Sequence, residues 1–190
     1  MIEKYICKKN IMIKIGMIHG RFQPFHMGHF DYFKKALRLV DKQLIIGIIN
    51  PTSEAIKNEL TDKHRHLLSA NPYTYFERLQ MIQKSISSLD IPIEELNKIL
   101  ILPFPIHEQR LWKFFVPKET VQIMSVLEPW DKEKRERFNE YGYKTYYLDC
   151  HRITSGINVR RAIKNKQSWQ DLVPVGTREV LVTIQKNDNI

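Results

Sequence analysis

The chain has 190 residues, of which 43% are hydrophobic and 27% charged, and this fits one soluble domain that buries about 70% of its unfolded surface. Its formal net charge of +9 is compatible with nucleic acid, an anionic membrane surface or a small phosphate-rich ligand as the partner. Cys7 and Cys150 have no C-x-x-C spacing, and no run approaches the ~18 apolar residues of a transmembrane helix. These features exclude a disulfide framework, a cysteine zinc cluster and a membrane span, and we expect a protein of the reducing cytoplasm.

Five short apolar runs have the composition of strands that are covered on both faces. They are continuous and rich in β-branched or aromatic residues. In chain order the predicted strands are residues 12–18, 43–49, 99–102, 121–127 and 144–148.

Between and after these runs, apolar residues recur at helical spacing. The predicted helices are residues 30–40, 75–88, 132–141, 159–164 and 178–185. This alternation predicts an α/β fold with a doubly wound sheet of five parallel strands, whose ligand site lies beyond the carboxyl ends of the strands. Without repeats, low-complexity tracts or linkers, residues 1–190 read as a single domain, with residues 1–11 as a candidate N-terminal extension. The long loops 50–71 and 103–116 are expected at the ligand-binding edge.

The segment "GMIHGRFQPFHMGHF" joins the first predicted strand to the first predicted helix. At such a junction, free backbone N–H groups and the positive end of a helix bind phosphate. Gly20 allows close backbone approach, Gly28 keeps the helix entry open, and Pro24 stiffens the turn. His26 and His29, three residues apart, share one face of the first helical turn. Their imidazoles can donate hydrogen bonds to phosphate and, when protonated, offset charge that develops during phosphoryl or nucleotidyl transfer.

Two other interpretations of His26 and His29 stay open. They could bind zinc, although zinc sites need three or four protein ligands and Asp31 is the one Cys, Asp or Glu in this stretch. They could also be polar surface residues at a helix cap. The surrounding glycines and the buried strand before them favour phosphate binding, so no metal ligand is assigned.

The stretch "GRFQPFHMGH" from Gly20 resembles the H-x-G-H signature of the nucleotidyltransferase superfamily, in the form of the archaeal-type nicotinamide mononucleotide adenylyltransferases. The segments "NPYTYFERLQMI", "ILILPFP" with "LWKFFVP", and "WQDLVP" resemble further parts of that family. The resemblance implies a Rossmann-like fold, homo-oligomers, and catalysis by His26, His29 and Arg160. It also implies that ATP phosphates are bound at Gly20, Arg21, Phe22, Gln23 and Gly28.

A second signature, close to S-x-T-x-I-R-R in the family, corresponds to "ITSGINVRRAI" from Ile153. Taken alone, the segment predicts a helix capped by Ser155 with an arginine pair that can grip phosphate, but a capped surface helix with solvated arginines is then the favoured interpretation. The resemblance assigns phosphate binding to Thr154, Ser155, Gly156 and Arg161, beside Arg160. Ile157 stands in place of the family's threonine and Asn158 in place of its usual glutamate, so Thr154 or Ser155 would supply the missing hydroxyl.

Three other places bear on the acceptor. After the fourth predicted strand the family has T-G-N, whereas this chain has "LEPWDKEKRERF", which places Trp130 and Asp131 at the acceptor and leaves its identity open. Trp112 matches a tryptophan that stacks on nicotinamide in the family, and a core residue is the evenly weighted alternative. The stretch "TDKHRHLLSA", which holds His64 and His66, is interpreted as a solvated loop rather than a basic flap over phosphates.

The resemblance implies transfer of AMP from ATP to the 5′-phosphate of nicotinamide mononucleotide, which gives NAD and pyrophosphate. Mg²⁺ would be carried mainly by the substrate phosphates. We expect ATP and a phosphorylated small molecule as partners and no membrane; nucleic acid is not favoured, because acidic residues nearly cancel the basic stretch "DKEKRERF". Two alternatives remain: an adenylyl- or cytidylyltransferase with another phosphorylated acceptor, and a non-catalytic ligand-sensing or nucleic-acid-binding module on the same fold.

Overall fold

Five parallel strands form one sheet in the order β3-β2-β1-β4-β5, which confirms the doubly wound α/β prediction. The computed structural model describes residues 12–52, 67–125, 130–151 and 153–187, so residues 1–11 and most of the "TDKHRHLLSA" stretch lie outside it. The strands are β1 (Ile13–Gly20), β2 (Val40–Ile49), β3 (Ile99–Phe104), β4 (Val121–Ser125) and β5 (Thr145–Leu148).

The described part of the chain also contains seven α-helices and three 3₁₀ turns, of which α6, η3 and α7 follow the last strand. They are α1 (Met27–Leu37), η1 (Leu68–Ala70), α2 (Tyr75–Ser87), α3 (Ile93–Asn97), η2 (Gln109–Leu111), α4 (Trp112–Phe115), α5 (Trp130–Glu140), α6 (Gly156–Lys164), η3 (Gln170–Leu172) and α7 (Val175–Asn187). The five predicted helices are present. The predicted loop 103–116 is partly ordered, because it contains the end of β3, η2 and α4.

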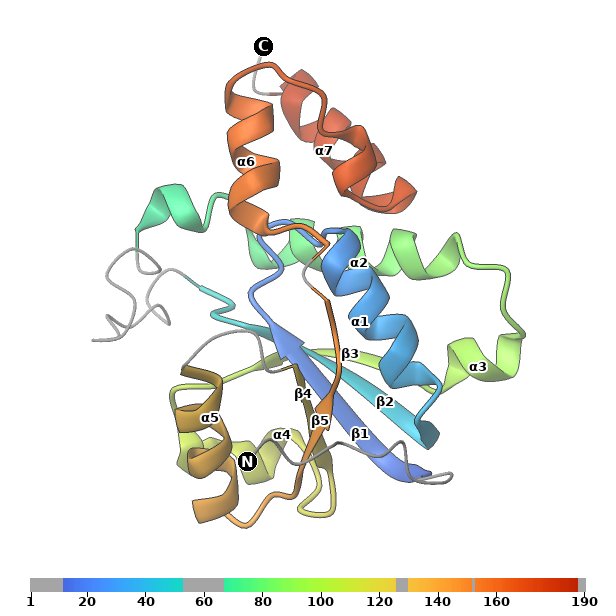
Figure 1. Cartoon of the computed structure of the whole chain (residues 1–190), viewed down its shortest axis with the longest axis vertical. Helices are drawn as coiled ribbons and strands as arrows, with labels where there is room; N and C mark the ends of the chain where they lie inside the picture. The colour runs from blue at the N-terminus through green and yellow to red at the C-terminus, as the bar shows by residue number, and fades with distance from the viewer. Residues whose placement is uncertain (1–11, 53–66, 126–129, 152, 188–190) are drawn as a thin grey trace, which may run out of the picture.

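The two faces of the sheet carry separate hydrophobic clusters. Because side chains alternate along a strand, Ile18 packs into one cluster with α1, α2, α6 and α7, and Met17 packs into the other with α4 and α5. Figure 1 shows α4 and α5 together on one side of the sheet, and α6 and α7 beyond the carboxyl ends of the strands.

The strand order creates a switch point between β1 and β4. The chain runs from β1 outward through β2 to β3 and then returns to β4 on the other side of β1. In doubly wound sheets, ligands bind in the crevice at such a point. The carboxyl ends of β1 and β4 are therefore where the fold places a site.

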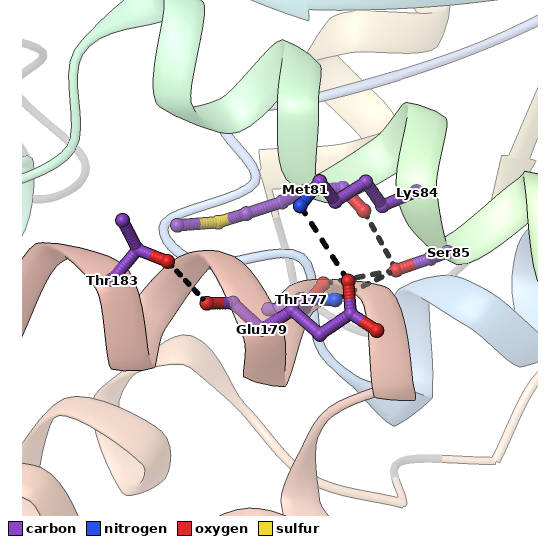
Figure 2. A network of polar contacts seen from close by, with 6 residues as sticks. All are labelled: Met81, Lys84, Ser85, Thr177, Glu179 and Thr183. Carbon is purple, nitrogen blue, oxygen red and sulfur yellow. Dashed lines mark hydrogen bonds and ion pairs between the residues drawn. The ribbon is translucent and has the colours of Figure 1, made fainter.

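A buried hydroxyl pair fastens α7 to α2, as Figure 2 shows. Ser85 Oγ donates to the Met81 carbonyl at 2.6 Å, lies 3.1 Å from Thr177 Oγ1, and accepts from the Thr177 N–H at 3.1 Å. Gly176 lies directly on the α2 backbone, since a Cβ there would be 2.2 Å from the Lys84 carbonyl carbon. These contacts between α7 and α2 hold the C-terminal helix, which follows α6 in the chain, against the rest of the domain.

Trp112 belongs to the core cluster on the α4–α5 side. Its side chain is 1% exposed, its Nε1–H donates to the Pro105 carbonyl at 2.9 Å, and its ring centroid is 4.4 Å from that of Phe138. The structure corrects the acceptor-stacking interpretation, because neither face of the indole is open to a ligand. The core alternative describes this residue.

Trp112→Ala is expected to lower the free energy of unfolding by about 3–5 kcal/mol, because it removes a buried indole and leaves a cavity. Thermal and denaturant unfolding measure the loss, and Trp112→Phe, which keeps an aromatic ring, should lose less. A stable variant with a selective rise in the KM of the acceptor would restore the stacking interpretation.

Candidate active site

A cavity of about 300 Å³ opens at the carboxyl ends of β1 and β4. The two sequence signatures meet there, and Arg160 donates a hydrogen bond to the Gln23 carbonyl across 137 positions of the chain. Residues of both signatures line the cavity: Gly20, Arg21, Phe22, Gln23, His26, Gly28, His29, Thr154, Ser155, Gly156, Ile157 and Arg160. The N-termini of α1 and α6 therefore converge on one space.

His26 and His29 cap α1 with their own side chains. Nδ1 of His26 accepts from the His29 N–H at 3.3 Å, and Nδ1 of His29 accepts from the His26 N–H at 3.4 Å. This is a reciprocal capping box built from two imidazoles. Because each Nδ1 accepts, a neutral ring in this arrangement carries its proton on Nε2.

The surroundings of His29 disfavour its charged form. Burial lowers the pKa of His29 well below its ordinary range, His26 and Arg21 lower it further, and the Pro24 carbonyl opposes the shift. The ring centroids of His26 and His29 are 3.6 Å apart, so two positive charges there would repel each other strongly. The expectation that protonated imidazoles offset charge during transfer stays a prediction, because a bound polyanion favours the charged form.

Glycines allow the α6 N-terminus to approach the first loop. A Cβ on Gly156 would lie 2.6 Å from the Gln23 carbonyl oxygen. A Cβ on Gly28 would lie 3.1 Å from the His26 ring and 3.3 Å from the Thr154 carbonyl oxygen. Side chains at these two positions would push the helix ends apart.

Thr154 is the hydroxyl that can replace the one missing at Ile157. Its Oγ1 is buried without a hydrogen-bond partner, and the residue lines the cavity. Ser155 is instead the N-cap of α6, since its Oγ accepts from the Asn158 N–H at 3.3 Å. A buried hydroxyl without a partner is unfavourable, which makes Thr154 a candidate phosphate ligand.

Arg160 and Arg161 have different surroundings. Arg160 is half-buried in the cavity wall, and burial lowers its pKa while Tyr73 opposes the shift. Arginine nevertheless stays charged at pH 7. Arg161 is exposed and lines a shallow depression along α6 with Arg160, Lys164 and Asn165.

Gln23 and Phe22 hold the loop through their side chains, and phosphate binding at these two positions stays a prediction. The Gln23 amide pairs with the N–H and the carbonyl of Tyr73, both at 2.9 Å. Phe22 is 1% exposed, and its ring lies edge-on to His29 with centroids 4.9 Å apart. Arg21 lines the cavity, and its Nη1 donates to Asn71 Oδ1 at 3.3 Å.

Arg78 on α2 supports the site and was not predicted. It is 2% exposed and donates to the carbonyls of Arg21 and Ile49 at 2.9 Å, Asn50 at 2.8 Å and Thr74 at 3.1 Å. Burial lowers its pKa to about 10. One guanidinium thus ties the ends of β1 and β2 to the start of α2.

Arg78→Ala is expected to lower the free energy of unfolding by about 2–4 kcal/mol, because several buried carbonyls lose their donor. Arg78→Lys should recover part of this, since an ammonium lacks the planar fork. Chemical denaturation measures both variants. If Arg78→Ala unfolds at the same denaturant concentration as the wild type, the hydrogen bonds from Arg78 to these carbonyls contribute nothing to stability.

The predicted acceptor residues and the zinc interpretation can be compared with the described part of the chain. Trp130 and Asp131 begin α5, but their side chains lie outside the described residues, so their placement at the acceptor stays a prediction. In the described part of the chain, no three His, Cys, Asp or Glu residues converge as a metal site, and Asp31 pairs with Lys35 at 2.9 Å. The zinc interpretation therefore lacks a ligand set among these residues. Nor does any described helix combine the length and apolar character needed to cross a membrane.

The chain is similar to known proteins over most of its length. The model of the cytidylyltransferase-like family matches residues 17–137. The chain is 32% identical to a phosphonoformate cytidylyltransferase of Streptomyces viridochromogenes, over 87% of this chain and 89% of that protein. It is 29% identical to a nicotinamide-nucleotide adenylyltransferase of Methanococcus aeolicus, over 92% of each.

A solved structure agrees at the level of the fold. It is a bifunctional NMN adenylyltransferase/ADP ribose pyrophosphatase from Francisella tularensis in complex with AMP and a manganese ion. It superposes with a TM-score of 0.61 at 18% identity, over 92% of this chain and 50% of that one. The parallel sheet and its covering helices are shared.

Proposed function

This chain belongs to the cytidylyltransferase-like family, and we propose that it transfers AMP from ATP to the 5′-phosphate of nicotinamide mononucleotide. It is a nucleotidyltransferase close to the archaeal nicotinamide-nucleotide adenylyltransferases. The observation that carries the proposal is the convergence of two helix N-termini, with His26, His29, Thr154 and Arg160, on one cavity.

The reaction needs positioning and charge stabilisation more than a protein nucleophile. An oxygen of the acceptor phosphate, already anionic at neutral pH, bonds to the α-phosphorus of ATP. The bond from this phosphorus to the bridging oxygen breaks, and pyrophosphate leaves with the electron pair. Catalysis then consists of alignment and stabilisation of the five-coordinate phosphorus and the leaving group.

Different residues would bind the α-phosphate and the leaving pyrophosphate. The Nε2–H groups of His26 and His29 would donate to oxygens of the α-phosphate at the α1 N-terminus. Thr154, the N-terminus of α6 and Arg160 would hold the leaving pyrophosphate. The tie from Arg160 to the Gln23 carbonyl keeps the two groups of donors together.

The residues of this site fit Mg²⁺ that is bound by the nucleotide phosphates rather than by protein carboxylates. The residues that line the described cavity include no Asp or Glu, and its donors are imidazoles, hydroxyls and cations. Mg²⁺ prefers oxygen ligands and retains waters, so the substrate phosphates would hold it and it would neutralise their charge.

A second candidate is CMP transfer to a small phosphonate or phosphate. It is favoured by the cytidylyltransferase relative and by the sequence departures at Ile157 and after β4.

A pyrophosphate-release screen decides between the two candidates. It pairs ATP, CTP, GTP and UTP with nicotinamide mononucleotide and phosphonoformate. We expect turnover with ATP and nicotinamide mononucleotide. Release with CTP and phosphonoformate instead would establish the second candidate, and nucleotide binding without release from any pair would indicate a non-catalytic module.

A further inference from the structure

A second polar group lines the cavity on the α5 side of the sheet. His19 at the end of β1, Ser125 at the end of β4 and Lys134 on α5 contribute to its wall. The His19 ring lies 6.0 Å from Phe104 and 5.3 Å from Phe138, which belong to the core cluster under α4 and α5. The histidines of α1 lie on the opposite side, so the cavity has two chemically distinct ends.

His19 is an unfavourable residue for its surroundings. Both ring nitrogens are buried without a hydrogen-bond partner, and so are both amide atoms of the fully buried Gln122. Gln122 is near enough to raise the pKa of His19, but the two side chains do not reach hydrogen-bond geometry. An apolar residue would suit the aromatic neighbours of His19 better. Because His19 lines the cavity, a ligand that draws its ring toward the cavity would satisfy one of these nitrogens.

The three side chains can all act as donors. Burial and then Lys134 lower the pKa of His19 well below its ordinary value, so at neutral pH its ring is uncharged and has one N–H to donate. The hydroxyl of Ser125 and the ammonium of Lys134 donate as well. Such a set matches an oxygen that accepts hydrogen bonds, as in a carboxamide or a carboxylate.

The geometry of transfer places the acceptor at this end. In-line displacement needs the attacking and leaving oxygens on opposite sides of the α-phosphorus. A depression continues from the cavity past Arg160 along α6, and Arg160 at its mouth suits the anionic leaving group. The acceptor would then approach from the side of His19.

We propose that His19, with Ser125 and Lys134, selects the acceptor by binding a carboxamide or carboxylate oxygen of that acceptor. This inference rests on the proposed nucleotidyl transfer and extends it to the identity of the acceptor. The two oxygen types correspond to the amide of nicotinamide mononucleotide and the carboxylate of a small phosphonate.

His19→Leu tests the proposal in steady-state kinetics with Mg²⁺ and the preferred nucleotide. The acceptors are nicotinamide mononucleotide, its carboxylate analogue nicotinate mononucleotide, and phosphonoformate. The KM of the accepted compound should rise about tenfold, from the loss of one hydrogen bond, while the KM of the nucleotide stays within about twofold. The melting temperature should stay equal or rise, because an apolar side chain replaces an unpaired polar one. His19→Gln keeps a donor and should retain most of the affinity for the acceptor.

Thr120→Val is the matched control. Thr120 is also buried with an unpaired hydroxyl but does not line the cavity. This variant should leave both KM values unchanged. The same behaviour in His19→Leu would overturn the proposal, as would a lower melting temperature with equal rises in both KM values. If the wild-type protein releases pyrophosphate with none of the three acceptors, both the proposed function and this inference fail. If the wild type turns over an acceptor but His19→Leu behaves like Thr120→Val, only the inference about His19 fails.

Discussion

His29→Ala is expected to lower kcat by about two to four decades while the fold stays intact. The substitution removes an Nε2–H donor from the α-phosphate. It also removes the Nδ1 acceptor for the backbone N–H of His26, so the N-terminus of α1 loses one of its two reciprocal capping bonds. His26→Ala should fall in the same range, because the capping bonds are reciprocal.

Single-turnover and steady-state rates, with circular dichroism melting of each variant, measure this effect. His107→Ala is the control, since His107 is a histidine outside the cavity wall and its replacement should leave kcat unchanged. Near-wild-type turnover in either His26→Ala or His29→Ala would remove the assignment of the α-phosphate to this pair.

Arg160→Ala is expected to lower kcat/KM for ATP by about two to three decades, and Arg161→Ala by far less. Arg160 lines the cavity and is tied to the Gln23 carbonyl, whereas Arg161 is exposed. Neighbouring helix residues point about 100° apart, so the two guanidinium groups cannot both face one phosphate.

Rates over a range of ATP concentrations test the difference, and the exposed Arg161 serves as the matched control on the same helix. Arg160→Lys should keep the charge but lose bidentate contact, and should lie between the wild type and Arg160→Ala. Equal losses in Arg160→Ala and Arg161→Ala would show that α6 does not present Arg160 to the leaving group.

The sheet could be predicted because its strands are covered on both faces and so appear as continuous apolar runs. The first and last residues of the helices were harder to predict from the sequence. Helix α1 begins at Met27 rather than at residue 30, because His26 caps it through an imidazole, which is not among the common cap residues. Helix α3 was missed, since it has five residues and none is buried.

The candidate site was predicted where its residues follow one another in the chain. His26, His29 and Arg160 stand in two local signatures, and the cavity brings them together. The signal for Arg78 is a charged residue on the face of α2 that also buries Met81 and Ile82. Its carbonyl partners come from distant loops, so their identity follows only from the tertiary structure.

Trp112 and His19 illustrate the remaining difficulty. An indole suits a core and a stacking site equally well, and only packing against Phe138 decides between them. His19 follows the apolar run Ile15–Ile18 of the strand "IKIGMIHG", but its neighbours across the sheet are separated from it in sequence. A polar residue in such a strand is the signal that could have marked it as functional.

Direct measurement of both products tests the central claim, that two helix N-termini hold one nucleotide for transfer to an acceptor phosphate. Wild-type protein is incubated with ATP, nicotinamide mononucleotide and Mg²⁺, and NAD and pyrophosphate are quantified in the same samples by mass spectrometry and a coupled assay. We predict equal amounts of NAD and pyrophosphate, and loss of both in His29→Ala. Pyrophosphate accompanied by free AMP without NAD, or NAD formation unaffected by His29→Ala, would contradict the account.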